Sequence, residues 1–177
     1  ELDAFRKSDQ EVLTLVASHA AVAIENARLY ETIRANELRL DREVRFAQRV
    51  QAALLPTELP KRMKQVDVAA HFAPARELGG DLYDFLAPDP NSLVVAVGDV
   101  SGKGVPAALF MAVTRTLIRS VAATTASPSV CLARANRLLC QENEQGMFVT
   151  LFYGVLDLGS GALAYTNAGH NPPWVLR

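Results

Sequence analysis

The sequence is poor in cysteine, with only Cys131 and Cys140 among its 177 residues. These two residues lie on one predicted helix, and their spacing along it places them on roughly opposite faces. They therefore cannot form a disulfide within that helix. We interpret them as small buried side chains in a reducing compartment, which predicts a cytoplasmic location.

An excess of charge is also missing, because 18 basic side chains are balanced by 19 acidic ones. Nucleic-acid binding generally requires a basic surface, so the composition argues against it. From residue 66 onward the chain is slightly acidic, which suits divalent cations. No apolar run approaches the roughly 20 residues of a membrane span, and no signal peptide begins the chain. It starts without Met, so we interpret it as part of a longer protein.

Glycine and proline are absent from the first 55 residues, which predicts one long helix that ends at Pro56. Its apolar positions follow two heptad frames, separated by a three-residue phase slip. The first frame holds Val16, Ala20, Ala23, Ala27 and Tyr30, and the second holds Ile33, Leu40, Val44, Ala47 and Leu54. Either the helix packs on its own domain, or it leaves one domain and pairs with a partner chain. The phase slip favours pairing, because a change of partner requires a change of face.

From residue 66 onward the hydrophobic pattern alternates between strand and helix periods. Strands are predicted at 66–73, 82–86 and 93–97, followed by helices at 105–117 and 129–141. A hairpin then joins strands 147–158 and 162–166 through the turn Gly-Ser-Gly at 159–161. The order of strands, two helices and a hairpin indicates an α+β fold with antiparallel pairing.

Two clusters of glycine and aspartate carry the chemical signal. Asp81 lies in Gly-Gly-Asp-Leu-Tyr-Asp at 79–84, and Asp99 lies in Gly-Asp-Val-Ser-Gly-Lys-Gly at 98–104. A carboxylate beside a buried strand needs a positive partner, and Mg²⁺ or Mn²⁺ prefers carboxylate and carbonyl oxygens. The alternative is that both aspartates are turn or cap residues. The spacing around Lys103 does not fit a Walker phosphate-binding loop.

These clusters, together with Asn-Ala-Gly-His-Asn-Pro-Pro at 167–173 and Met-Phe-Val-Thr-Leu-Phe-Tyr-Gly at 147–154, resemble signatures of a known family. The family is the SpoIIE/RsbU-type branch of the metal-dependent PPM serine/threonine phosphatases. The resemblance implies stacked antiparallel sheets flanked by helices and a two-metal centre of Mn²⁺ or Mg²⁺. Water activated by the metals would attack phosphorus in line, without a covalent enzyme intermediate.

The resemblance also implies roles for individual residues. Asp99 would bridge both metals, the backbone carbonyl of Val100 would bind one, and Asp81 would hold a metal or its waters. Arg76 is a candidate for substrate phosphate or an ordinary surface arginine, and Lys103 is a phosphate candidate or a turn residue. Ser101 stands where some relatives place a general-acid histidine, which leaves that role unassigned. His170 is more simply interpreted as a turn histidine than as a catalytic acid.

Residues 18–30 separately resemble the last helix of a GAF sensor domain. The expected organisation is therefore a GAF-like end at 1–32, a coiled-coil linker at 33–56 and the N-terminal portion of a phosphatase domain at 57–177. The family's further metal-binding aspartates, from a Thr-Asp-Gly motif and a later position, do not occur before Arg177. We expect the chain alone to be inactive for that reason.

Two functions are compatible with this organisation. In the first, the parent protein hydrolyses phosphoserine or phosphothreonine on a regulatory protein of bacterial signalling, which the resemblance suggests is a STAS-type anti-anti-sigma factor. In the second, the chain is a non-catalytic module that dimerises through the linker helix and transmits the state of a sensor. The phosphatase is the favoured interpretation, as a homodimer without nucleic-acid partners.

Overall fold

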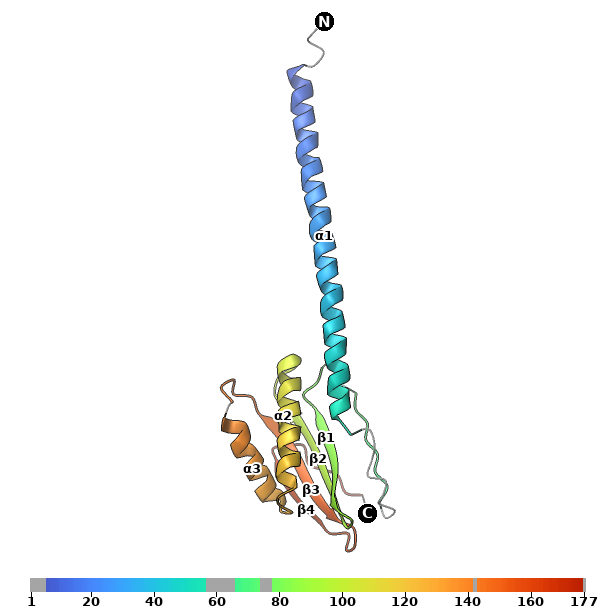
Figure 1. Ribbon diagram of the computed structural model, residues 1–177, viewed down its shortest axis with the longest axis vertical. Helices are drawn as coiled ribbons and strands as arrows, with labels where there is room; N and C mark the ends of the chain where they lie inside the picture. Colours follow the sequence, from blue (N-terminus) through green and yellow to red (C-terminus); the bar gives the residue numbers. More distant parts are fainter. Residues whose placement is uncertain (1–5, 57–65, 74–77, 142, 177) are drawn as a thin grey trace. The chain divides into compact units, whose positions relative to one another are not determined.

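The computed structural model describes residues 6–56, 66–73, 78–141 and 143–176. The chain divides into two units, Glu1–Val44 and Arg45–Arg177. The expected boundaries at residues 32 and 56 differ from this division and stay predictions. Figure 1 shows the helices and strands.

Helix α1 spans Lys7–Leu54, and this confirms the long helix predicted from the absence of glycine and proline. Along most of this helix the side chains are exposed, including Ile33 and Leu40 of the second heptad frame. A monomer therefore leaves the predicted apolar seam of α1 open to solvent. Only the last turns, which belong to the second unit, contain buried side chains such as Gln51.

The second unit contains a four-stranded antiparallel sheet in the order β1-β2-β3-β4. The strands are β1 (Leu82–Asp89), β2 (Ser92–Val100), β3 (Val149–Asp157) and β4 (Leu163–Ala168). Helices α2 (Val105–Ala122) and α3 (Pro128–Gln141) connect β2 to β3, and α2 packs on β1 and β2 while α3 packs on β3 and β4 (Figure 1). The predicted α+β class with antiparallel pairing is confirmed.

The hydrophobic core lies between the sheet and the two helices. Side chains of alternate strand residues, such as Leu82, Val94 and Ala96, meet the buried face of α2 around Met111 and Ile118. This is the pattern expected when one face of an antiparallel sheet is covered. The opposite face is more open among the described residues, where Val97 is 39 % exposed. Among the described residues, helices α2 and α3 therefore cover one face of the sheet.

Other expectations also need correction. Residues 66–73 form no strand, and α3 begins at Pro128 rather than at Ser129. The described residues contain one antiparallel sheet, in keeping with the expected partial PPM fold.

The sequence analysis expected no segment that could span a membrane. Helix α2 is long and apolar enough to do so by length and composition, with a mean hydropathy of 1.3. Its buried face and two arginines that bind a buried aspartate instead mark it as a core helix of the domain.

Gly98 provides a test of the close packing between β2 and β3. A Cβ at this position would lie 2.8 Å from the Thr150 carbonyl oxygen and 2.6 Å from a Leu151 methyl carbon. We expect Gly98→Ala to lower the free energy of unfolding by about 1–3 kcal/mol through overpacking, measured by urea denaturation. Gly159→Ala is the matched control, because its new methyl would meet the Asn91 side chain at 3.1 Å, which can move aside. Equal stabilities of the two variants would contradict the expected clash.

Candidate metal centre

The pairing of β1 with β2 places the two aspartates beside each other. Leu82 pairs with Gly98, so Asp81, just before β1, adjoins Asp99 near the end of β2. The Asp99 carboxyl acts on the Asp81 carboxyl and raises its pKa, as expected for two neighbouring side chains, and both residues line one groove. The expected convergence of these groups is therefore observed, although about 18 residues separate them in sequence.

The electrostatics of this pair are unfavourable when both groups are ionised. Although Asp81 retains an exposed surface, partial burial of its carboxyl is the largest cause that raises its pKa, followed by the hydrogen bond and the negative charge of Asp99. His170 acts in the opposite direction and lowers the pKa of Asp81. The site thus holds two like charges at close range, an arrangement that a bound cation would stabilise.

Glycine allows the backbone of the first cluster to approach β2. Gly80 accepts a hydrogen bond from the Val100 N–H at 3.3 Å, and a Cβ on Gly80 would lie 2.8 Å from the Val100 carbonyl oxygen. That oxygen, the expected backbone ligand, therefore lies against the residue that precedes Asp81. After Asp99, Gly102 and Gly104 adopt φ values of 92° and 74°, which side chains disfavour, and turn the chain into α2.

The last turns of α1 hold this segment in place. The Gln51 side chain is 5 % exposed and donates to the Gly79 carbonyl oxygen at 2.6 Å, while its own oxygen accepts from the Gly79 N–H at 3.2 Å. The Tyr83 hydroxyl donates to the Pro56 carbonyl at 3.2 Å. A buried amide with both ends bonded to one backbone residue fixes that residue firmly. The sequence analysis did not predict this role of Gln51.

His170 lies at the same site and is held from two directions. Its backbone N–H donates to the Asn167 side chain at 2.8 Å, and the Asn167 amide donates to the His170 carbonyl at 2.9 Å. The ring nitrogen Nδ1 lies 2.9 Å from the Thr150 hydroxyl, which also approaches the backbone oxygen of Asp99 at 3.4 Å. The expected turn role is observed, but the histidine also faces the aspartate pair, which the motif alone did not reveal.

Asp81, Asp99 and His170 line one groove of about 750 Å³ on the open face of the sheet. Its remaining walls are mainly apolar and come from β1, β2 and residues 68–73. Carboxylates at the end of an apolar groove are less well hydrated than on a flat surface, which strengthens their interaction with a cation. The groove therefore places the hard oxygen ligands and the histidine at one end.

The sequence also offered Lys103, Arg76 and Ser101 as residues of interest at the site. Lys103 is exposed in the loop before α2 and is not one of the groove residues. Arg76 lies outside the described residues. The Ser101 hydroxyl accepts a hydrogen bond from the Phe148 N–H at 3.0 Å, so it is used to join β2 to the start of β3.

The donor set fits a hard divalent cation in part. Two carboxylates and a neighbouring backbone carbonyl are the oxygen ligands that Mg²⁺ and Mn²⁺ prefer, usually with several waters. Among the described residues, no group of three or more Asp, Glu, His or Cys side chains could hold a metal ion. Asp81, Asp99 and Val100 are therefore the candidate ligands from this part of the chain.

Comparisons with known proteins show the family of this chain. The family described as Stage II sporulation protein E (SpoIIE) matches residues 89–177. This chain belongs to the SpoIIE family. The phosphoserine phosphatase RsbU of Bacillus subtilis is 34% identical over 143 residues, which cover 81% of this chain and 42% of RsbU. The SpoIIE-family chain thus spans less than half the length of this relative.

Solved structures support the fold of the SpoIIE-family chain. A crystal structure of RsbU and RsbW domains from Mycobacterium tuberculosis is 36% identical, with a TM-score of 0.50, over 56% of this chain and 28% of that one. The SiaA-PP2C domain of Pseudomonas aeruginosa has a TM-score of 0.61 at 21% identity, over 75% of this chain and 54% of that chain. The second likeness shows that the sheet and helices follow the PP2C phosphatase fold.

The raised pKa of Asp81 predicts a stability change when its neighbour loses charge. A carboxyl whose folded-state pKa lies above the unfolded value of 3.8 stabilises the fold below that value and loses this contribution as the pH rises. Asp99→Asn removes the repulsion, so the metal-free variant should be more stable than the wild type at pH 7. The gain should vanish below pH 3.8, where Asp81 is protonated in both states.

Urea denaturation in EDTA at both pH values checks this prediction. Asp89→Asn is the control, because it removes an exposed carboxylate at the far end of β1 while its side-chain oxygen can still accept from the Asn91 N–H. A variant at position 99 that is no more stable than the wild type at pH 7 would contradict the like-charge account.

Proposed function

We propose that the parent protein is a metal-dependent PPM-type protein phosphatase that hydrolyses phosphoserine or phosphothreonine on a regulatory protein. The observation that carries this proposal is the convergence of the Asp81 and Asp99 carboxyl groups at the end of the groove. Membership of the SpoIIE family and similarity to a phosphoserine phosphatase, RsbU, support it. We propose Mn²⁺ or Mg²⁺ as the cofactor, in a two-metal centre.

The residues of this chain would act as ligands and as positioning groups. Asp99 would bridge the two cations, Val100 would offer its carbonyl oxygen, and Asp81 would hold a cation or its waters. When bound, the cations would supply a water made nucleophilic at neutral pH and neutralise charge on the phosphoryl group. Gln51 would keep the Gly79 segment in place, which limits movement of Asp81. Arg76 and Lys103 are proposed as weaker contacts to substrate phosphate.

The proposed substrate is a phosphorylated regulator of a sigma-factor pathway, of the STAS-domain anti-anti-sigma type, in the bacterial cytoplasm. The name of RsbU supports phosphoserine as the target residue. An open groove beside the candidate ligands is compatible with a protein substrate, since a side chain must reach the reacting phosphorus from outside.

The long helix suggests how the activity is regulated. We propose that α1 links a GAF-like sensor end, residues 1–32, to the phosphatase and pairs with its copy in a homodimer. More than half of the Ile33 and Leu40 surface is exposed, at 53 % and 54 %, so the seam is available for pairing. The alternative function, a dimerising module without catalysis, rests on the same exposed seam. Activity of the full-length protein separates the two.

The full-length protein should release phosphate from a phosphoserine protein only when Mn²⁺ or Mg²⁺ is present. Asp99→Asn should abolish turnover, because a neutral amide cannot bridge two cations as a carboxylate does. Phosphate release is measured with and without EDTA, and circular dichroism checks that the variant is folded. Undiminished turnover by the folded variant, or turnover in EDTA, would exclude the proposed role of Asp99.

A rotational coupling through α1 predicts a phase-dependent response to insertions. One to four alanines are inserted after Arg34 in the full-length protein, and phosphatase activity is measured with the sensor unchanged. Because α1 contains no glycine or proline, activity should vary with the added rotation and partly recover near four residues, about one helical turn. The same activity for all four insertions would indicate that α1 is only a static tether.

A further inference from the structure

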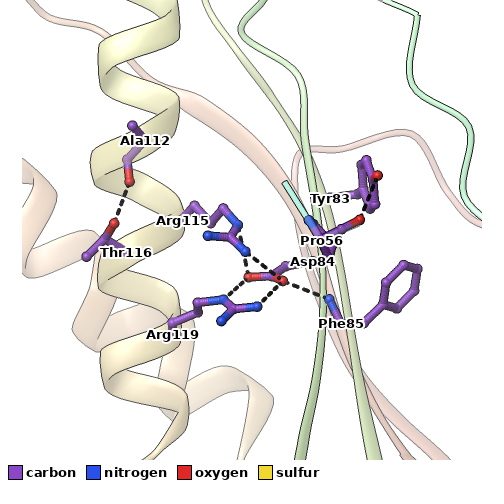
Figure 2. Close-up of polar contacts among 8 residues, drawn as sticks. All are labelled: Pro56, Tyr83, Asp84, Phe85, Ala112, Arg115, Thr116 and Arg119. Atoms are coloured by element: carbon purple, nitrogen blue, oxygen red, sulfur yellow. Dashed lines mark hydrogen bonds and ion pairs between the residues drawn. The ribbon is translucent and has the colours of Figure 1, made fainter. Parts of the chain in front are cut away.

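A buried carboxylate on the face of β1 that meets α2 binds two arginines of that helix (Figure 2). Asp84 is 1 % exposed. Arg119 forms a two-pronged contact, with Nε donating to Oδ2 at 2.5 Å and Nη2 donating to Oδ1 at 2.7 Å. Arg115 donates from Nη2 to Oδ1 at 3.3 Å, and its Nε lies 3.2 Å from Oδ2 without the alignment of a hydrogen bond. The Phe85 N–H also donates to Oδ1, at 2.9 Å.

The geometry of this cluster restricts how α2 can sit on the sheet. Arg115 and Arg119 are four residues apart, so they project from one face of the helix, about one turn from each other. Both can reach the same carboxylate only over a narrow range of helix rotation and height. The apolar contact offers less restriction, because small side chains such as Ala107 and Ala108 make non-directional contacts that tolerate sliding. Charge-assisted, two-pronged hydrogen bonds are directional.

Stability alone gives a weak account of this cluster. Burial lowers the pKa of Arg115, which reports the unfavourable desolvation of its guanidinium, while the charge of Asp84 acts in the opposite direction. For Arg119 the hydrogen bond to Asp84 is the largest cause and raises the pKa. Buried ion pairs often stabilise a fold no better than well-packed apolar residues of the same volume. The directional restriction on α2 is what apolar residues could not supply.

Both joined elements lead directly to the aspartate pair. β1 begins one residue after Asp81, and α2 begins at Val105, immediately after the loop that follows Asp99. The loop is short and ends at Gly104, whose carbonyl oxygen accepts the Ala108 N–H at 3.0 Å. A shift of α2 along β1 would therefore pull on the chain next to Asp99 while Asp81 stayed with β1.

We propose that Asp84, Arg115 and Arg119 are positioning residues that set the register of α2 on β1 and thereby the separation of the Asp81 and Asp99 carboxylates. The metal-binding part of this inference rests on the proposed function, whereas the register itself does not. None of the three residues lines the groove, although Phe85, whose N–H donates to Asp84, does. The effect of the cluster on the candidate ligands is therefore indirect.

The test uses the full-length protein and two variants that disrupt the cluster in different ways. The first, Asp84→Leu with Arg115→Met and Arg119→Met, removes all three charges together and leaves no buried charge without a partner. The second, Arg119→Lys, keeps the charge but cannot form the two-pronged contact. Arg137→Met, on the exposed surface of α3, is the matched control for loss of an arginine. Amide hydrogen exchange in EDTA and calorimetric titration with MnCl₂ are measured for each.

For the triple variant we expect several-fold faster exchange at residues 79–82 and 98–104, unchanged exchange in α3, and about tenfold weaker Mn²⁺ binding. Arg119→Lys should also speed the exchange and weaken Mn²⁺ binding, by smaller factors. If the triple variant does not fold, Arg119→Lys alone tests the positioning role. Wild-type exchange in both segments of a folded variant would overturn the positioning role. Failure of the wild-type protein to bind Mn²⁺ would instead overturn the proposed function. The exchange data, recorded without metal, would still show whether the cluster sets the register of α2 on β1.

Discussion

The structure of the site depends on the antiparallel pairing of β1 with β2, which holds two carboxyl groups together against their mutual repulsion. The register Leu82 with Gly98 makes Asp81 and Asp99 neighbours. Partial burial, and after it the hydrogen bond and negative charge of Asp99, raise the pKa of Asp81. A fold that tolerates such an arrangement gives up some stability at neutral pH in return for a site prepared for a cation.

The rest of the second unit can be understood as support for this arrangement. Gln51 fixes the backbone before Asp81 through Gly79, and Gly80 allows that backbone to lie against Val100. Asp84 attaches β1 to α2 on the opposite side of the strand. Each support acts on backbone or on buried side chains, so the two carboxylates can face the groove.

Much of the fold could be predicted from the sequence because its signals are local. The absence of glycine and proline predicted α1, and the period of apolar residues predicted four strands and two helices close to their observed bounds. The strand predicted at 66–73 was wrong. These residues alternate loosely, and several of them line one wall of the groove, but they do not pair with a strand. The pair Asp81 and Asp99 was predicted from glycine spacing and from the family resemblance. The partners of Asp84 and Gln51 could not be predicted. Hydrogen bonds between residues about 28 to 35 positions apart produce no periodic pattern in the sequence.

We propose above that Asp81 and Asp99 together bind divalent cations. Anomalous diffraction from crystals of the full-length protein grown with MnCl₂, recorded at the manganese absorption edge, tests it most directly. We expect anomalous peaks coordinated by both carboxylates, with the Val100 carbonyl oxygen as a further ligand, and loss of the bridged peaks in Asp99→Asn. Peaks only elsewhere in the protein, or unchanged peaks in the variant, would contradict it.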